Sequence, residues 1–324
     1  MKKDETTVAK LLRDIVQHGH RIKSRYLLVV VLGIIWTVLG LLSPVFFTSS
    51  NLFSIAVSVT SIALLAIGQT FVILTAGIDL SVGSTLALTQ VCSVSLMLMG
   101  VGPVQSALIG LGIGAICGFL NGFIVTKGLP PFIVTLGTMG IFRGIALIIT
   151  GGFPVRLPYE NFQYLARGKL AGVFPIPVLI VIVLYVLASI VLQNTRFGLH
   201  IYAIGSNEQG AIYTGVRASL IKLGVYTISG MTAALAGLIQ AARVISAYPS
   251  AGTGAELDSI AAVVIGGTSF FGGTGNILLT FVGAIAMGTL RNGSNLLGIS
   301  SFVQQIVIGI IIIAVIQVTS LRRS

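Results

Sequence analysis

Long apolar runs, separated by short stretches that contain charge, glycine or proline, follow one another along almost the whole sequence. A helix needs about 20 apolar residues to cross the hydrocarbon core of a membrane, which is roughly 30 Å thick. The runs predict ten spans, at residues 26–42, 52–75, 81–99, 104–126, 132–150, 173–192, 220–246, 257–267, 277–290 and 302–318. Unbroken runs such as 306–315 lack the alternation of a membrane β-barrel. We therefore predict an all-α, polytopic membrane protein of about ten transmembrane helices.

Two places depart from this regular pattern. The run at 257–267 would form only about 16 Å of helix, which is too short to cross the bilayer. The segment Gly-Ile-Asp-Leu-Ser-Val-Gly-Ser at 77–84 is polar and flanked by glycine inside an apolar region. Irregular backbone at membrane depth is tolerated where protein or a water-filled cavity satisfies it. We therefore expect broken or half-length helices near the centre, bordering a translocation path.

Composition and charge placement add an orientation. The chain of 324 residues is 55 % hydrophobic and 8 % charged, with a mean hydropathy of +1.03, so we expect a single transmembrane domain at 26–321 and no soluble domain. The tail at 1–25 holds seven of the 19 Lys and Arg residues and has a net charge of +4. The positive-inside bias then predicts a cytoplasmic N-terminus, and an even number of spans predicts a cytoplasmic C-terminus. The basic excess indicates orientation and contact with membrane lipid, not nucleic acid.

Asp79 is the only charged residue between Arg25 and Lys127. A carboxylate costs at least ~2.5 kcal/mol at the centre of a bilayer, so its position requires a reason. Asp79 could cap the following helix near the cytoplasmic interface by accepting the amide of Ser81 or Val82. The alternative, compatible with the first, is a role in a gate or in the path.

Three arginines fall at or near membrane depth. Arg143 lies near the middle of its span, where its side chain either snorkels to an interface or contacts a carbonyl or an acid inside the protein. Arg243 and Arg291 lie near the outer face, against the positive-inside trend. They are either interface anchors or contacts for acidic residues of an external partner.

Signatures of catalysis are scarce. Glu256 and Asp258 precede or open the short span and suit the positive end of a helix dipole, with ligand contact as the alternative. The glycine-rich segment 266–275 lacks the Lys-Ser/Thr ending of a phosphate loop, and instead predicts close helix approach and a sharp reversal. The three histidines and two cysteines are too scattered to form a metal or acid/base site. We predict a protein that is not an enzyme and binds no metal or cofactor itself.

The loop at 193–219 is the most polar interior stretch. Gly205 and Gly215 bracket residues 207–213, which are long enough for two turns of helix lying across the membrane face. This helix is either part of a passive connection or a docking element for a cytosolic partner.

Four motifs, in order and over residues 41–321, resemble the permease subunits of bacterial ATP-binding-cassette importers for ribose, xylose and related simple sugars. They are the segment at 77–84 and the sequences Pro-Phe-Ile-Val-Thr-Leu-Gly-Thr-Met at 131–139, Tyr-Ala-Ile-Gly-Ser-Asn-Glu at 202–208 and Ala-Gly-Thr-Gly-Ala-Glu-Leu-Asp-Ser-Ile-Ala-Ala-Val-Val-Ile-Gly-Gly-Thr-Ser at 251–269.

The resemblance implies a second permease copy, identical or closely related, a cytosolic ATPase that binds ATP and Mg²⁺, and an extracytoplasmic sugar-binding protein. It implies a bacterial inner-membrane location and uptake of a monosaccharide, with ribose or another pentose favoured. Carried over by position, Gly205, Asn207, Glu208, Ala211 and Gly215 would couple to the ATPase, whereas Asp79, Ser81, Arg143, Glu256 and Asp258 would border the path or its gate. A nucleoside, a furanosyl signal molecule or a branched-chain amino acid is the alternative cargo, and a stand-alone secondary transporter the alternative class.

Overall fold

Ten helices within residues 28–321 carry the ten predicted spans. The computed structural model describes residues 28–321, and the predicted basic tail at 1–25 lies outside them. The helices are Leu28–Leu42, α2 (Ser49–Leu74), α3 (Val82–Leu98), α4 (Pro103–Val125), α5 (Pro131–Thr150), α7 (Ile176–Asn194), α10 (Ala218–Val244), α11 (Ala255–Ile265), α12 (Ile277–Leu296) and α13 (Ser301–Leu321). The predicted all-α membrane architecture is therefore confirmed. The largest difference in length is at α12, which continues six residues beyond the predicted end at 290.

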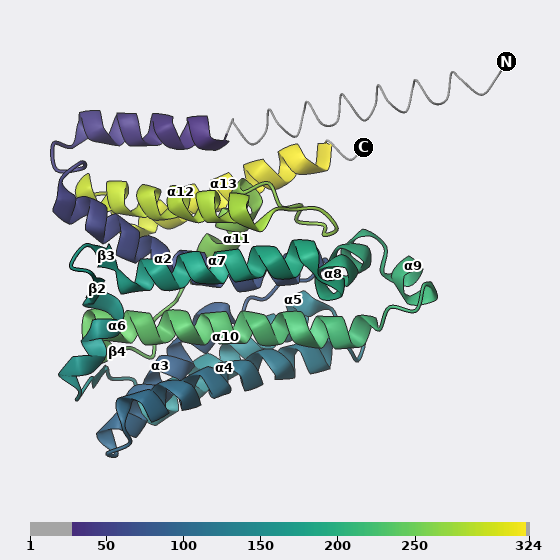
Figure 1. Cartoon of the computed structure of the whole chain (residues 1–324), viewed down its shortest axis with the longest axis horizontal. Coiled ribbons are helices and arrows are strands. Elements are labelled where there is room, and N and C mark those ends of the chain that lie inside the picture. Colours follow the sequence, from purple (N-terminus) through teal and green to yellow (C-terminus); the bar gives the residue numbers. More distant parts are fainter. Residues whose placement is uncertain (1–27, 322–324) are drawn as a thin grey trace.

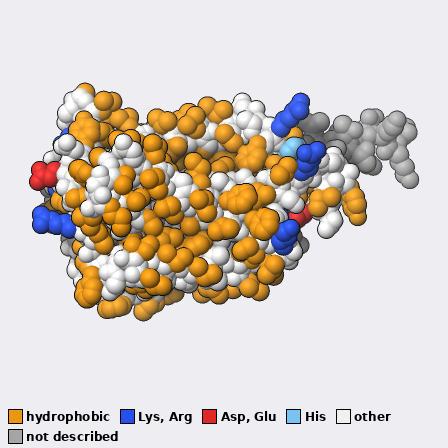
Figure 2. All heavy atoms as spheres, turned by 90° about the horizontal axis from the view of Figure 1, so that it is seen from below, with side chains coloured by type: hydrophobic (Ala, Val, Ile, Leu, Met, Phe, Trp, Pro, Cys, Tyr) orange, Lys and Arg blue, Asp and Glu red, His pale blue; other side chains and the backbone are white. Residues whose placement is uncertain are grey.

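Five of these helices meet the length and hydropathy expected of a membrane span, namely α2, α4, α5, α7 and α10. Shorter apolar helices accompany them, and α11 has the half-length that its 11 residues predict. Figure 2 shows a hydrophobic flank, with the charged side chains of this face gathered towards the two ends of the molecule. The chain is therefore a multi-pass membrane protein.

The segments that join the helices separate into two groups at opposite ends of the molecule (Figure 1). At one end lie α8 (Arg196–Ser206) and α9 (Glu208–Tyr213), and we call this the α9 end. At the other, the β2 end, β1 (Val155–Arg156) pairs with β4 (Ser246–Ala247), and β2 (Lys169–Leu170) pairs with β3 (Phe174–Pro175). The short η1 (Glu160–Gln163) and α6 (Tyr164–Arg167) complete this end.

Three helices, α2, α3 and α10, form most of the interior of the bundle. Most side chains of α2 are buried, and α10 packs against α2, α3 and α4. By contrast α4, α5 and α7 bury only one face, and the large apolar side chains on their other faces are exposed, as expected where lipid tails replace water.

Glycine allows α4 and α10 to approach closely. A Cβ atom built on Gly230 of α10 would overlap the carbonyl oxygen of Gly114 and lie 2.8 Å from the amide nitrogen of Gly118, both on α4. These neighbours are backbone atoms, which cannot turn away as a flexible side chain can. The contact between the two helices therefore depends on the absence of side chains.

Replacing Gly230 by leucine is expected to force α4 and α10 apart and to destabilise the protein by at least ~1–3 kcal/mol, the usual cost of overpacking. Gly112 offers a matched control on α4, because a Cβ there meets nothing within 4 Å. Thermal unfolding in detergent should show a lower midpoint for Gly230→Leu and a nearly unchanged one for Gly112→Leu. Equal midpoints would contradict the close contact.

Candidate translocation path

A polar cavity of about 440 Å³ lies between α2, α10, α11 and α12, in the half of the bundle nearer the β2 end. Its volume falls within the roughly 300–1,000 Å³ of small-molecule sites. The polar side chains around it carry hydroxyl, amide, carboxylate and guanidinium groups, from Ser58, Ser61, Gln240, Arg243, Thr253, Asp258 and Arg291. Such groups can both donate hydrogen bonds to a polar, uncharged solute and accept them from it.

An ion pair closes one side of this cavity. The Nη2 atom of Arg291 on α12 lies 2.6 Å from Oδ2 of Asp258 on α11, and the Asp258 side chain is only 6 % exposed. The contact uses one atom of each group: Asp258 Oδ1 and Arg291 Nε are buried with no hydrogen-bond partner among the described residues. A bidentate pairing would have used both carboxylate oxygens together with Nε and Nη2 of the arginine. In this pair Oδ1 and Nε can still each form a hydrogen bond.

The two arginines predicted near the outer face both line the cavity. Arg291 is engaged by Asp258 of its own chain, and Arg243 donates a hydrogen bond to Ser58 Oγ at 3.1 Å. Their guanidinium groups are therefore already used inside the bundle, and a role in docking an external protein stays a prediction.

Asp79 lies at the break between α2 and α3 and is 1 % exposed. Its Oδ1 accepts hydrogen bonds from the amide and hydroxyl of Ser81 at 2.9 and 2.7 Å, and its Oδ2 accepts one from the hydroxyl of Ser229 at 2.8 Å. Asn121 donates to the Ser81 hydroxyl at 2.7 Å, and Gln69 donates to the Asp79 carbonyl at 2.9 Å. Asp79 thus accepts a hydrogen bond from the Ser81 amide, which is one of the two capping bonds predicted from the sequence.

The depth expected for Asp79, near the cytoplasmic interface, stays a prediction. The chain turns back into the bundle after α2, so that Asp79 meets Ser229 near the middle of α10. Asn121, which bonds Ser81, lies in the last two turns of α4, towards the α9 end. Asp79 and Ser81 are also absent from the lining of the polar cavity. Their contacts join α3, α4 and α10, and this favours a structural role at the break.

Arg143 makes interior contacts, one of the two alternatives drawn from the sequence. Its guanidinium donates to the carbonyls of Pro249 and Ala251, at 2.7 and 2.5 Å, in the turn that leads into α11. The next residues of that turn reach Glu256, whose carboxylate accepts the Gly254 amide at 3.2 Å. Arg143 and Glu256 therefore hold the segment from which α11, and with it Asp258, enters the bundle.

The loop at 193–219 contains a second helix that the sequence analysis missed. Besides α9, residues Arg196–Ser206 form α8, which Thr195 caps by accepting the Gly198 amide. The signal was present in Phe197, Ile201 and Ile204, whose spacing gives a helix one apolar face. All three pack into the core, so the loop is folded against the bundle.

Gly205 does not stand between helices, as its bracketing position in the sequence predicted. It lies inside α8, and a Cβ there would overlap the carbonyl oxygen of Leu74 and the amide of Gly273. The Gly273 amide donates to that Leu74 carbonyl at 3.0 Å. Three backbones, at the end of α8, the end of α2 and the glycine-rich segment 266–275, thus meet without a side chain between them. We call this contact the three-backbone junction.

Asn207 marks the true boundary between α8 and α9, because its side chain caps α9 by accepting the Gly210 amide at 2.9 Å. Glu208 pairs with Lys222 of α10 at 2.5 Å, Ala211 is buried, and Gly215 has a φ of +88° just after the helix. Tyr202 of α8 donates to the Gly275 carbonyl at 3.2 Å, and burial raises the pKa of its hydroxyl. These contacts fix α9 to the bundle.

Large apolar side chains are exposed at the α9 end, on the folded loop. Tyr213 is 86 % exposed, and Leu199 and Ile212 are also exposed. These residues could not be singled out from the sequence, because only the fold shows which face of each helix is covered. They lie beside the predicted coupling residues and form the coupling face, defined as Leu199, Ile212 and Tyr213.

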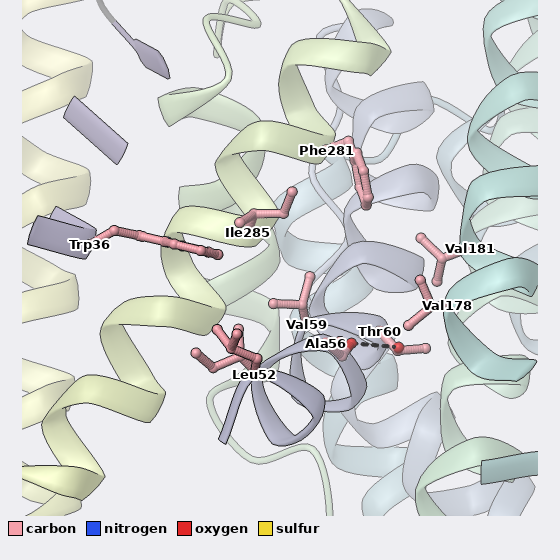
Figure 3. Close-up of a pocket in the computed structure, with 10 residues that line it drawn as sticks. Trp36, Leu52, Ala56, Val59, Thr60, Val178, Val181, Phe281 and Ile285 are labelled. Carbon is pink, nitrogen blue, oxygen red and sulfur yellow. Dashed lines mark hydrogen bonds between the residues drawn. The ribbon is translucent and has the colours of Figure 1, made fainter. Parts of the chain in front are cut away.

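A second hollow is apolar and lies on the flank of the bundle. About 320 Å³ in volume, it is lined by residues of the first described helix, α2, α7 and α12, including Trp36, Val59, Val181 and Phe281 (Figure 3). Its lining is almost entirely apolar, so it offers a polar solute too few hydrogen-bonding groups to serve as a route. Among the described residues, no group of three His, Cys, Asp or Glu side chains could hold a metal ion.

Membrane helices around a polar cavity, with a folded loop at one end, are typical of a membrane permease. Residues 51–316 match the family described as branched-chain amino acid transport system, permease component, and the chain belongs to this family.

The chain is similar to curated permeases along most of its length. It is 43 % identical to a ribose import permease protein of Bacillus subtilis over 285 residues, 87 % of this chain and 88 % of the relative. It is 44 % identical to a ribose import permease protein of Escherichia coli over 306 residues, 93 % of this chain and 94 % of the relative. A D-allose transport system permease protein of Escherichia coli is 40 % identical over 289 residues, 88 % of each chain. No solved structure matches the chain.

Proposed function

We propose that this chain is the membrane permease of an ATP-driven sugar importer and that ribose is its favoured cargo. The observation that carries the proposal is the 44 % identity to a ribose import permease over 93 % of the chain. The polar cavity supports it, because its hydroxyl and amide groups can hydrogen-bond a polyhydroxylated, uncharged solute.

The cavity suits a cargo that is released, not one that is held. The charge of Arg291 is compensated by Asp258, whereas Arg243 donates a hydrogen bond to the neutral Ser58 hydroxyl and is the one uncompensated charge among the described side chains that line the cavity. The atoms left without partners, Asp258 Oδ1 and Arg291 Nε, are one acceptor and one donor. When the helices around the ion pair move apart, this acceptor and donor become available to successive hydroxyl groups of a sugar, and binding stays weak enough for passage.

The partners are part of the proposal. A cytosolic ATPase binds ATP and Mg²⁺ and docks at the α9 end, an extracytoplasmic protein delivers the sugar at the β2 end, and a second permease copy, identical or related, completes the pathway. The chain itself binds no cofactor. It sits in the bacterial inner membrane with both termini cytoplasmic, as the basic tail at 1–25 favours.

Uptake measurements test the cargo. The tagged chain is purified from its native membranes with its ATPase, reconstituted in liposomes with the binding protein, and supplied with labelled ribose. We expect ATP-dependent uptake of labelled ribose. Excess unlabelled ribose should inhibit this uptake, and excess leucine should not. Uptake of leucine without ribose would assign the chain to the amino-acid cargo that the family description names. Gradient-driven uptake with no co-purifying ATPase would overturn the importer class.

The coupling face gives a second prediction. Tyr213→Asp places a charge on a side chain that is 86 % exposed, so folding should be unaffected. If this side chain is a central contact with the ATPase, its loss costs about 2 kcal/mol or more, roughly a thirtyfold weaker association. Co-purified ATPase and ATP-driven uptake should both fall. The exposed Tyr164 at the β2 end supplies the control, since Tyr164→Asp should retain the ATPase. Equal ATPase recovery from the two variants would contradict docking at α9.

A further inference from the structure

The apolar hollow on the flank of the bundle is shaped and placed to hold part of a lipid. Most of its lining is aliphatic or aromatic, and several lining residues, among them Trp36 and Leu52, are only half-buried, so the hollow is a groove open to the surface. Figure 3 shows side chains from α2, α7, α12 and the first described helix around this groove. In a multi-pass membrane protein such a flank faces lipid tails.

The groove offers no free polar group to a ligand. Only two of its lining residues carry polar side-chain atoms. Thr60 donates its hydroxyl to the carbonyl of Ala56 at 3.1 Å, and Trp36 donates its indole N–H to Thr289 Oγ1 at 3.2 Å. The part of a ligand that enters must therefore be hydrocarbon, and its polar part must remain outside.

A positive charge stands near the β2 end of the groove. Leu52 on the first turn of α2 and Val178 on the first turn of α7 line that end. Lys169 lies on β2, whose partner β3 leads directly into α7, and its Nζ is 5.0 Å from the ring centroid of Phe53, next to Leu52. Because Lys169 is exposed and has no ion pair among the described residues, its ammonium group can bind an anion at the level of the lipid headgroups.

We propose that this groove binds one acyl chain of an anionic phospholipid, with Lys169 contacting the phosphate. The apolar lining of the groove accommodates a hydrocarbon tail, and the positive charge of Lys169 at the β2 end of the groove favours an anionic headgroup. A basic side chain near an anionic surface contributes ~1 kcal/mol, so a phosphatidylglycerol should bind about five times more tightly than the zwitterionic phosphatidylethanolamine with the same chains. The site is independent of the cargo and of the ATPase.

Trp36 makes the proposal directly measurable, because it is the only tryptophan of the chain and lines the groove. The purified protein is placed in nanodiscs of phosphatidylcholine with a small fraction of lipid whose acyl chains carry bromine, which quenches indole fluorescence. Brominated phosphatidylglycerol should reach half-maximal quenching of Trp36 at about a fifth of the mole fraction that brominated phosphatidylethanolamine requires.

Lys169 and Lys127 each lie over a phenylalanine ring, so variants of the two distinguish a specific lipid site from the general attraction of anionic lipids to basic residues. Lys169→Gln should remove the preference for phosphatidylglycerol. Lys127 also lies 5.0 Å over a phenylalanine ring, that of Phe123, but at the opposite end of the bundle, so Lys127→Gln should keep the preference. Ala56→Leu, which fills the groove, should reduce quenching by both lipids to the level produced by lipids that contact the protein without a specific site. Equal quenching by the two lipids, an unchanged preference in Lys169→Gln, or a groove shielded from all lipid by a second copy of the chain would each overturn the proposal.

Discussion

Replacing Asp79 by leucine is expected to abolish the recovery of folded protein. Three donors, the amide and hydroxyl of Ser81 and the hydroxyl of Ser229, would lose their acceptor in a region closed to water. Each unsatisfied buried group costs about 1–3 kcal/mol, so the total approaches the whole stability of a typical protein. Size-exclusion chromatography of detergent-solubilised protein should show aggregate in place of the monodisperse peak.

Asp79→Asn is the control for this prediction, because the amide oxygen keeps one acceptor of similar shape and position. This variant should be recovered folded, with a lower thermal midpoint. Recovery of Asp79→Leu at the level of the unaltered protein would show that the hydrogen bonds at the break are dispensable. Full stability of Asp79→Asn together with lost uptake would instead favour the gate that the sequence analysis considered as the alternative.

Breaking the ion pair in the polar cavity should have the second large effect. Arg291→Leu leaves the Asp258 carboxylate buried without its partner, and such a loss typically costs ~3–5 kcal/mol. The double variant Asp258→Leu with Arg291→Leu removes both charges and should regain most of that stability. ATP-driven ribose uptake should stay at least tenfold below normal in both, because the double variant has lost the hydrogen-bonding groups of the path. Thermal unfolding and proteoliposome uptake measure the two effects separately.

The comparison with an exposed pair sharpens this test. Glu208 and Lys222 form an ion pair in which the Glu208 side chain is 42 % exposed, so Glu208→Gln should change stability by less than ~1 kcal/mol. Normal uptake by the Asp258 and Arg291 double variant would reduce the cavity pair to a purely structural contact. A stability loss in that double variant as large as in Arg291→Leu would contradict the role given to the unpaired charge.

The helices could be predicted from the sequence because hydrocarbon imposes a length and a composition that leave few alternatives. The same rule identified α11 as a half-length helix from its 11 residues. It could not show which helices Asp79 contacts, because the return of the chain into the bundle depends on packing against α4 and α10. The apolar face of α8 was visible in the sequence, but its polar flanks resembled an ordinary loop.

The polar cavity was predictable only in part. Charge at membrane depth singled out Asp258, Arg243 and Arg291, since each such residue requires a partner. The sequence could not show that these three surround one space, because they lie on different helices. Ser58, Ser61 and Gln240 were missed altogether: single polar residues in apolar helices are common, and only the fold shows that they face the same cavity.

The three-backbone junction has a mechanical consequence. Around Gly205, where α8, the end of α2 and the segment 266–275 touch, the nearest atoms are all backbone, which cannot change rotamer to absorb a displacement. The contact is therefore stiff, like the rest of a close-packed interior. We therefore expect a displacement of α8 to reach α2 and the linker between α11 and α12, and these three helices carry Ser58, Asp258 and Arg291. Backbone contacts thus connect the exposed loop at the α9 end to the helices that form the walls of the cavity.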